Sequence, residues 1–187
     1  PLNPYGWSKH AFDRQIMSII ERGGAAPPRW AGLKFFNVYG PRERHKGSMR
    51  SIMTSSFEAL SDGSPLRLFR SDRPHYDDGG QMRDFIFVDD CVKVMTWMLD
   101  HDFPGDVYNV GTGKAQTWLD AGNAMFSALD KAPMIEFIDM PDHLRGKYQY
   151  FTEASTAKLA AIGAPVPSTS LVEGVAATFR YMTSELQ

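Results

Sequence analysis

The sequence predicts an α/β protein with parallel strands, on the basis of three observations. Short apolar runs alternate with longer segments in which apolar residues recur every three or four positions, as they do in helices. Glycine and proline residues separate these segments along the whole chain. The runs at 33–38 and 85–88 are mostly apolar, which is typical of strands covered by helices on both faces of a sheet.

The elements follow one another to the end of the chain. A first helix is predicted from Tyr5 to about Glu21, because four apolar side chains recur there at helical spacing before paired glycines and prolines end it. Asp89 or Asp90 is predicted to cap a later helix, and Thr117 the helix after that. Strands are predicted at 33–38, 66–69, 85–88, 107–110 and 135–138, and further helices at about 92–99, 117–129 and 171–182. Residues 70–81 are predicted to form an irregular loop, of a kind that is usually functional or mobile.

Composition restricts the classes of function. The 187 residues are 43% hydrophobic and 12% aromatic, which is enough for a packed core. A formal charge of -2 provides no general basic field, so neither nucleic acid nor a membrane surface is expected as a partner. Cys91 is the only cysteine, which excludes an internal disulfide and fits a reducing compartment. Without an apolar run of membrane-spanning length or a signal-peptide pattern at 1–9, a soluble cytoplasmic protein is expected.

Tyr5 and Lys9 form the most informative short pattern in the chain, Tyr5-Gly6-Trp7-Ser8-Lys9. Residues four apart lie on one face of a helix, so a phenol and an ammonium would be neighbours. A phenol is a weak base at neutral pH, and a nearby ammonium helps by stabilising the phenolate. Lowering the pKa of a phenol from about 10 to about 7 takes on the order of 4 kcal/mol and needs a partly desolvated site. The same spacing is also that of an ordinary surface pair.

Two longer motifs follow in order. They are Asn37-Val38-Tyr39-Gly40-Pro41-Arg42 and Arg83-Asp84-Phe85-Ile86-Phe87-Val88-Asp89-Asp90. Together with the Tyr5 and Lys9 pattern, they resemble the motifs of the extended short-chain dehydrogenases/reductases that epimerise or dehydrate nucleotide sugars. The resemblance extends from Tyr5 to the last predicted helix.

Two further segments narrow this resemblance. Glu43-Arg44-His45-Lys46-Gly47-Ser48-Met49 resembles a signature of the ADP-glycero-manno-heptose 6-epimerases, and Gly146-Lys147-Tyr148-Gln149 resembles their late substrate loop. The resemblance implies interconversion of ADP-D-glycero- and ADP-L-glycero-manno-heptose through a 6-keto intermediate, in the synthesis of lipopolysaccharide core precursors. It also implies NADP, or else NAD, as the cofactor, a nucleotide sugar as the small-molecule partner, and a homo-oligomer.

The resemblance implies a role for each matching residue. Tyr5 would be an acid-base group at the reacting carbon, and Lys9 would assist it and hold the nicotinamide ribose. Lys46 would be the second acid-base group, which a lysine can be when neighbouring cations and burial favour its neutral form. The alternative for Lys46 is a solvated or phosphate-binding side chain. Cofactor contacts are implied at Tyr5, Lys9, Val38 and Lys46, and substrate contacts at Asn37, Ser48, Phe69, Ser71, Arg83 and Tyr148.

Arg83 and Phe69 have structural alternatives. An arginine suits a diphosphate because its planar fork donates two parallel hydrogen bonds. Arg83 could instead form an ion pair with Asp84 or Asp89, and Phe69 could belong to the core.

The resemblance also divides the chain into parts. Residues 1–40 would be the end of a dinucleotide-binding domain, and residues 41–187 would be mainly a substrate-binding domain, with 83–112 returning to the cofactor domain. The glycine-rich phosphate loop and the catalytic serine or threonine of the superfamily would precede residue 1. We therefore expect the N-terminal half to be missing, the isolated chain to be inactive, and an unpartnered helix and strand to expose apolar surface.

Two alternatives remain, one a different enzyme of the same superfamily and one from another class of function. A 4-epimerase or 4,6-dehydratase acting on UDP- or dTDP-sugars would share Tyr5 and Lys9, so Lys46 separates it from the heptose enzyme. The chain could also be an inactive fragment that only binds a nucleotide sugar or a partner subunit.

Three further patterns are interpreted as structural. The segment Gly111-Thr112-Gly113-Lys114 lacks residues that a phosphate-binding loop requires and is predicted to be a turn. His75, Asp77 and Asp78 are interpreted as solvated residues, so no metal site is predicted. The methionines within 92–99 and 123–129 are predicted to fill the core.

Overall fold

The computed structural model describes residues 3–185 and confirms the α/β class. The helices are α1 (Pro4–Glu21), the 3-10 helix η1 (Arg44–Met49), α2 (Ile52–Ser61), α3 (Val88–Asp100), α4 (Trp118–Ala128), α5 (Ala157–Ala161) and α6 (Leu171–Ser184). The strands are β1 (Ala31–Phe35), β2 (Asn37–Tyr39), β3 (Leu66–Phe69), β4 (Met82–Phe87), β5 (Asp106–Val110), β6 (Ala115–Thr117) and β7 (Ile135–Ile138).

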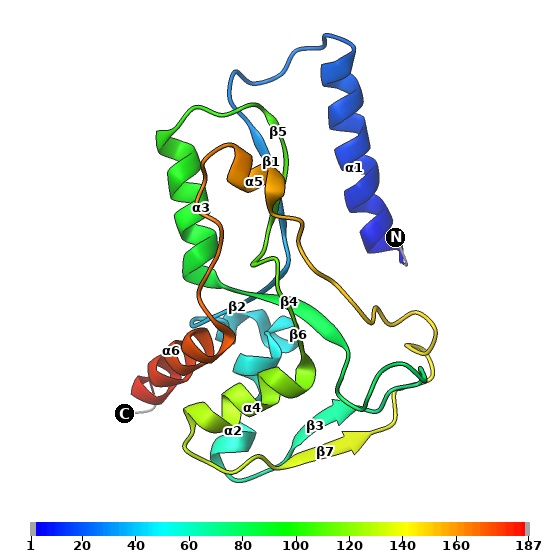
Figure 1. Cartoon of the computed structure of the whole chain (residues 1–187), viewed down its shortest axis with the longest axis vertical. Helices are drawn as coiled ribbons and strands as arrows, with labels where there is room; N and C mark the ends of the chain where they lie inside the picture. The colour runs from blue at the N-terminus through cyan, green and yellow to red at the C-terminus, as the bar shows by residue number, and fades with distance from the viewer. Residues whose placement is uncertain (1–2, 186–187) are drawn as a thin grey trace.

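The strands of the described residues form three small sheets. β1 pairs with β5 in parallel, and β3 pairs with β7 in parallel. β4 lies between β2, to which it is parallel, and β6, to which it is antiparallel. Figure 1 shows the β1–β5 pair at one end of the molecule and the β3–β7 pair at the other, with β2, β4 and β6 between them.

The predicted single strand at 33–38 is wrong, because the chain changes sheets at Phe36. The Phe36 N–H still donates to Val110 O of β5 at 3.1 Å. Val38 N–H then donates to Phe36 O at 2.9 Å, which is the bond of a γ-turn and bends the chain. From Asn37 onward the backbone pairs with β4 instead. A continuous apolar run cannot reveal this break, since both halves are strands.

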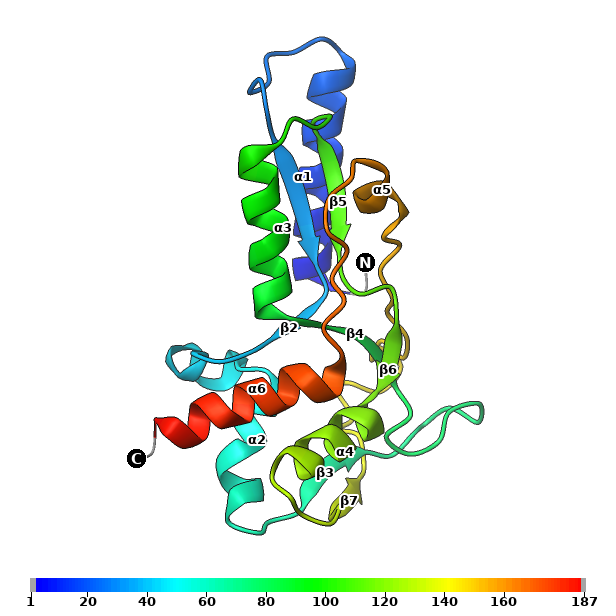
Figure 2. The ribbon, with the colours of Figure 1, turned by 60° about the vertical axis from the view of Figure 1, so that its left-hand side comes forward.

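α1 and α3 flank the β1–β5 pair on either side (Figures 1 and 2). α3 is packed closely, with Cys91, Val94 and Met98 in a core shared with Tyr108 and Val110 of β5. Burial raises the pKa of the Cys91 thiol to about 12, so this cysteine is unreactive at neutral pH.

By contrast, α1 contributes no fully buried residue. Its apolar face lines a cavity of about 290 Å³ that faces β1, and the Lys34 ammonium reaches across to the Asp13 carboxylate at 2.5 Å. A second apolar hollow of about 410 Å³ lies between β1 and α3. Among the described residues β1 pairs with β5 alone. The expected exposed apolar surface is therefore present on α1 and along β1.

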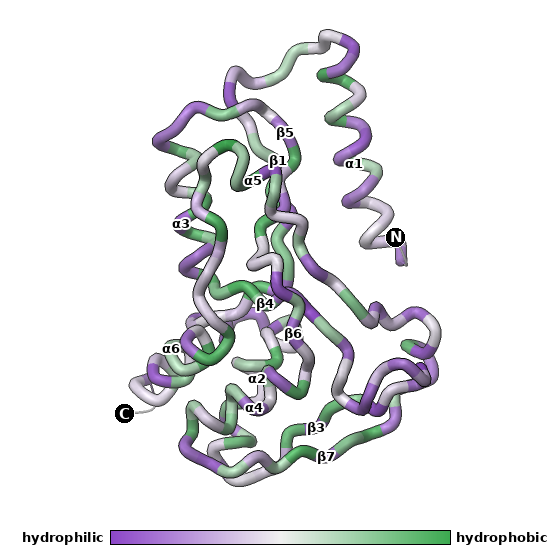
Figure 3. Tube along the Cα trace, in the orientation of Figure 1, coloured by the Kyte–Doolittle hydropathy of each residue, from purple (hydrophilic) through white to green (hydrophobic). Residues whose placement is uncertain are grey.

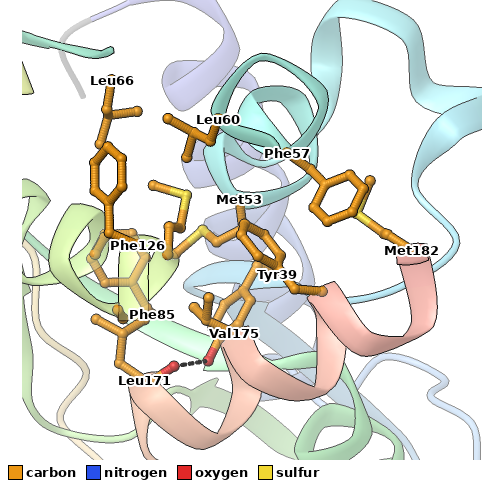
Figure 4. Close-up of a cluster of buried hydrophobic side chains, with 14 of the residues drawn as sticks. Tyr39, Met53, Phe57, Leu60, Leu66, Phe85, Phe126, Leu171, Val175 and Met182 are labelled. Carbon is orange, nitrogen blue, oxygen red and sulfur yellow. Dashed lines mark hydrogen bonds between the residues drawn. The ribbon is translucent and has the colours of Figure 1, made fainter. Parts of the chain in front are cut away.

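The second core lies between α2, α4, α6 and the strands β3 and β4. Figure 4 shows Tyr39 at its centre, where the phenol donates a hydrogen bond to Leu171 O at 3.4 Å. A Cβ at Gly174 of α6 would lie 2.1 Å from the Tyr39 hydroxyl oxygen, which explains a glycine inside a helix. Tyr39 follows Asn37 and Val38 in β2, so this core fixes the strand that carries them.

The two predicted helix caps have different outcomes. Thr117 caps α4 in a capping box with Asp120, as predicted. The predicted cap at Asp89 or Asp90 is wrong, because α3 begins at Val88 and both aspartates lie in its first turn. Asp90 instead accepts hydrogen bonds from the backbone N–H groups of Ser168 and Thr169, at 3.0 and 2.8 Å. Burial opposes ionisation of Asp90, but hydrogen bonds from Lys93 and these N–H groups outweigh it and lower its pKa.

The segment between β3 and β4 is an irregular loop, as predicted, and is hydrophilic along most of its length (Figure 3). It folds around Tyr150, whose hydroxyl donates to the Asp72 carboxylate at 2.5 Å and accepts from Asp72 N–H at 2.8 Å.

The prediction that methionines fill the core is confirmed for Met98 and Met125, which are buried, but is wrong for Met95, which is exposed. No helix within residues 3–185 is both long and apolar enough to span a membrane.

Candidate active site

Three adjoining cavities lie between the N-terminal end of α1 and the second core. The first, of about 570 Å³, is bounded by α1, β2, η1 and the starts of α2 and α4. The second, of about 510 Å³, lies between α1 and residues 144–149, and the third, of about 230 Å³, lies between β3 and α4. Tyr5 lines the first and second cavities, Trp118 the first and third, and Tyr148 the second and third. These shared walls make the three cavities one candidate site.

Tyr5 and Lys9 lie one turn apart on α1, as predicted. The Lys9 ammonium is 5.3 Å from the centroid of the Tyr5 ring, within the range of a cation–π interaction. Asn3 caps this helix by accepting from Gly6 N–H at 2.7 Å, which fixes the turn that carries Tyr5. Tyr5 is 72% exposed, so the described residues do not supply the desolvation that a phenol base needs.

Asn37, Val38 and Lys46 all line the first cavity together with Tyr5. Asn37 and Val38 reach this cavity because the chain changes sheets at Phe36 and continues as β2. Lys46 reaches it from the 3-10 helix η1. The carboxylate of Glu43 lies 4.0 Å from the Lys46 ammonium nitrogen. Lys46 thus has an anion as its ion-pair partner, although the cation Arg50 lines the same cavity.

Arg83 is only 8% exposed, and its guanidinium lies near two aromatic rings. It is 5.1 Å from the centroid of Tyr148 and 5.8 Å from that of Trp118. One amino group donates to Met82 O at 2.8 Å, and burial lowers the pKa of this guanidinium. In the described part of the chain Arg83 forms no ion pair with Asp84 or Asp89, so that alternative is wrong.

Phe69 lines the third cavity at the end of β3, with its ring 5.9 Å from that of Tyr148 in an edge-to-face arrangement. It is half-buried rather than part of the core. Ser48 and Ser71 line none of the three cavities. Ser48 is exposed on η1, while the Ser71 hydroxyl donates to Arg73 O at 2.9 Å inside the loop.

Asp84, next to Arg83, is fully buried and holds the turn after β5. Its carboxylate accepts from the backbone N–H groups of Thr112, Gly113 and Ala154 at 2.8, 2.9 and 3.0 Å, and from the Thr112 hydroxyl at 2.7 Å. The Gly-Thr-Gly-Lys segment is therefore a turn, as predicted, and its N–H groups at Thr112 and Gly113 already donate to a carboxylate.

Sequence reasoning missed Glu43 and Trp118 as residues of the first cavity. Glu43 could have been noticed as the single acid within a basic segment, three residues before Lys46. Trp118 follows the capping residue Thr117, and an aromatic residue at the first position of a helix gives no sign that it faces a cavity.

Within residues 3–185 no group of three or more acidic, histidine or cysteine side chains is arranged to hold a metal ion.

The model of the family described as NAD dependent epimerase/dehydratase matches residues 1–111. The chain belongs to the NAD-dependent epimerase/dehydratase family. Two curated relatives are named ADP-L-glycero-D-manno-heptose-6-epimerase. The one from Nitratidesulfovibrio vulgaris is 53% identical over 94% of this chain and 53% of its own length. The one from Fusobacterium nucleatum is 42% identical over the same shares of the two chains.

Solved structures of this family share the fold. The UDP-glucose 4-epimerase of Thermus thermophilus in complex with NAD is 27% identical, with a TM-score of 0.76 over 98% of this chain and 55% of that one. The ADP-L-glycero-D-manno-heptose-6-epimerase of Helicobacter pylori has the same TM-score at 23% identity, over 98% of this chain and 52% of that one. The chain thus spans about half the length of the relatives that it matches.

Proposed function

We propose that this chain is the catalytic and substrate-binding part of an ADP-glycero-manno-heptose 6-epimerase. The observation that carries the proposal is the first cavity, which Tyr5, Asn37 and Lys46 line together although they come from separate segments. The 53% identity to a relative of that name supports the choice of substrate. The product would serve the assembly of lipopolysaccharide core.

We further propose NADP as the cofactor, with NAD as the alternative. When bound, a nicotinamide accepts a hydride from the carbinol carbon and returns it to the opposite face. The residues present fit part of such a site, because Tyr5, Val38 and Lys46 line one cavity and the Lys9 ammonium lies next to the Tyr5 ring.

Each residue of the chain then has a separate task. Tyr5 takes the proton from the hydroxyl of one epimer as its hydride leaves, while Lys9 stabilises the phenolate. When the hydride returns to the opposite face of the 6-keto sugar, Lys46 gives a proton to the ketone oxygen from a different wall of the cavity, and the two groups take the reverse roles in the reverse reaction. Exchange with solvent restores both protonation states between turnovers. Arg83 binds the diphosphate from its aromatic surroundings, and Phe69 and Tyr148 contact the nucleotide and sugar.

The chain acts, in our proposal, together with a cofactor-binding segment that completes the sheet at β1. Within residues 3–185 one edge of β1 has no partner strand, and this edge, the two apolar hollows beside β1 and the exposure of Tyr5 support the proposal. Residues 1–40 and the region 83–112 would belong to that dinucleotide-binding domain, and the rest to the substrate-binding domain. We use the term parent protein for this chain joined to that segment.

The first test is conversion of ADP-D-glycero-manno-heptose to its L-glycero epimer, followed by chromatography of the two epimers. We expect turnover by the parent protein and none by the isolated chain. Turnover by the isolated chain at the rate of the parent protein would contradict the need for a further segment. A parent protein that epimerises UDP-glucose but not the ADP-heptose would contradict the proposed substrate.

Lys46→Ala separates the heptose enzyme from a sugar 4-epimerase, with which it would share Tyr5 and Lys9. We expect the substitution to lower kcat of the parent protein by a factor of about 10² or more, since it removes one of two acid-base groups. Lys147→Ala is the matched control, because it also removes a lysine charge from the candidate site, in the second cavity rather than the first. It therefore reports the effect of losing positive charge near an anionic substrate. A Lys46→Ala variant with unchanged kcat would favour the 4-epimerase.

A further inference from the structure

We propose that Glu43 is a positioning residue that holds the Lys46 ammonium in place in the first cavity. The inference rests on the proposed function and assigns a role to Glu43, to which the resemblance of the segment 43–49 gave none. Glu43 acts through Lys46 and is not itself an acid-base group in the reaction.

Glu43 is buried and contacts both Lys46 and the start of α2. The residue is 4% exposed although it belongs to an exposed segment. Its carboxylate accepts from Ser51 N–H at 2.6 Å and lies 4.0 Å from the Lys46 nitrogen. The backbone adds a second tie, because Lys46 N–H donates to Glu43 O at 2.9 Å. Ser51 caps α2, so the carboxylate joins Lys46 to the start of a buried helix.

The burial of this carboxylate needs an explanation. Removing a carboxylate from water costs several kcal/mol unless hydrogen bonds and an opposite charge compensate. Ser51 N–H provides one short hydrogen bond, and the N-terminal end of the α2 dipole is also favourable. The ammonium of Lys46 is the compensating charge, so the two side chains depend on each other.

The position of Glu43 within the site also fits this role. Glu43 lines the first cavity together with Tyr5 and two cations, Lys46 and Arg50, so its single carboxylate does not make this wall negative overall. Arg83 lines none of the three cavities, although its neighbours Tyr148 and Trp118 do. Glu43 thus lies in the wall that carries Tyr5 and Lys46, the two groups proposed for proton transfer.

Lys46 needs such a support because little else in the described chain restrains it. Its side chain is 43% exposed, and it precedes Gly47, whose φ of 55° interrupts η1. A free lysine side chain samples many rotamers, and a misplacement of about 1 Å can lower a rate by a factor of about 10².

The test is a double-mutant cycle in the parent protein with Glu43→Gln and Lys46→Ala. We expect Glu43→Gln to lower kcat for the ADP-heptose by a factor of about 10 or more, with KM changed by less than about threefold. In the Lys46→Ala background, Glu43→Gln should have no further effect on kcat. Glu58→Gln is the matched control, because it removes another carboxylate near the same segment, the exposed partner of Arg44, and should leave kcat unchanged.

If Glu43→Gln lowers kcat equally in the unaltered parent protein and in the Lys46→Ala variant, its role is structural and the proposal is overturned. An unchanged kcat for Glu43→Gln in the otherwise unaltered parent protein would also overturn it. The amide oxygen introduced by Glu43→Gln can still accept from Ser51 N–H, and thermal melting of every variant reports any loss of stability separately from turnover. If Glu43→Gln does not fold, Glu43→Asp keeps the charge and is taken through the same cycle. Failure of the unaltered parent protein to convert the ADP-heptose would instead overturn the proposed function, and with it this role.

Discussion

Replacement of Tyr5 by phenylalanine is expected to lower kcat of the parent protein by a factor of about 10² to 10⁴, which is the range for loss of a general acid-base group. The substitution removes one hydroxyl from a side chain that is 72% exposed, so the fold and the cavity wall should remain. KM for the ADP-heptose should change little, because the contacts that we propose for the diphosphate and nucleotide, at Arg83 and Phe69, do not involve Tyr5. Steady-state kinetics with the epimers separated by chromatography measure both values.

Trp7→Phe is the matched control for this prediction. Trp7 lies on the same turn of α1 and is also exposed, but it lines none of the three cavities. Its substitution should leave kcat unchanged. A Tyr5→Phe variant that keeps more than about a tenth of kcat would show that another group moves the proton, and the assignment of the base would then be wrong.

The sequence predicts those parts of the fold that depend on local patterns. The strands at 66–69 and 135–138 have the predicted bounds, and Thr117 caps its helix, because turn residues and side-chain periodicity are local signals. That these two strands pair in parallel is a contact between residues about 69 positions apart, and no local pattern encodes it. The change of sheet at Phe36 is hidden for a similar reason, since β1 and β2 read as one apolar run.

Residues of the candidate site could be predicted where their motif lies at the start or end of a helix or strand. Tyr5, Asn37 and Lys46 line one cavity because a helix start, a strand start and a 3-10 helix meet there. Arg83 was expected on the diphosphate, but its position between Tyr148 and Trp118 depends on segments far along the chain. Ser71 lies in a loop whose shape depends on Tyr150, and a residue-by-residue resemblance cannot place such a loop.

Asp84→Asn is expected to destabilise the parent protein by about 3 kcal/mol. Each oxygen of the Asp84 carboxylate accepts two hydrogen bonds. An amide oxygen can keep the pair from Gly113 and Ala154, while its NH₂ group faces Thr112, whose hydroxyl can turn to accept but whose N–H loses its partner. An unsatisfied buried donor costs about 1–3 kcal/mol, and the charge that strengthened the remaining bonds is also lost. Urea unfolding measures the change as a lower midpoint at constant slope.

Asp89→Asn is the control, because Asp89 belongs to the same motif but is exposed, and surface substitutions usually change stability by less than about 0.5 kcal/mol. A loss below about 1 kcal/mol for Asp84→Asn would mean that the turn after β5 does not depend on this carboxylate. Adjacent residues of a strand point to opposite faces, so Arg83 faces the aromatic site while Asp84 faces the turn. The two residues therefore have separate environments, since Arg83 lies against the Tyr148 ring while Asp84 joins β4 to the turn at 111–113 and to Ala154.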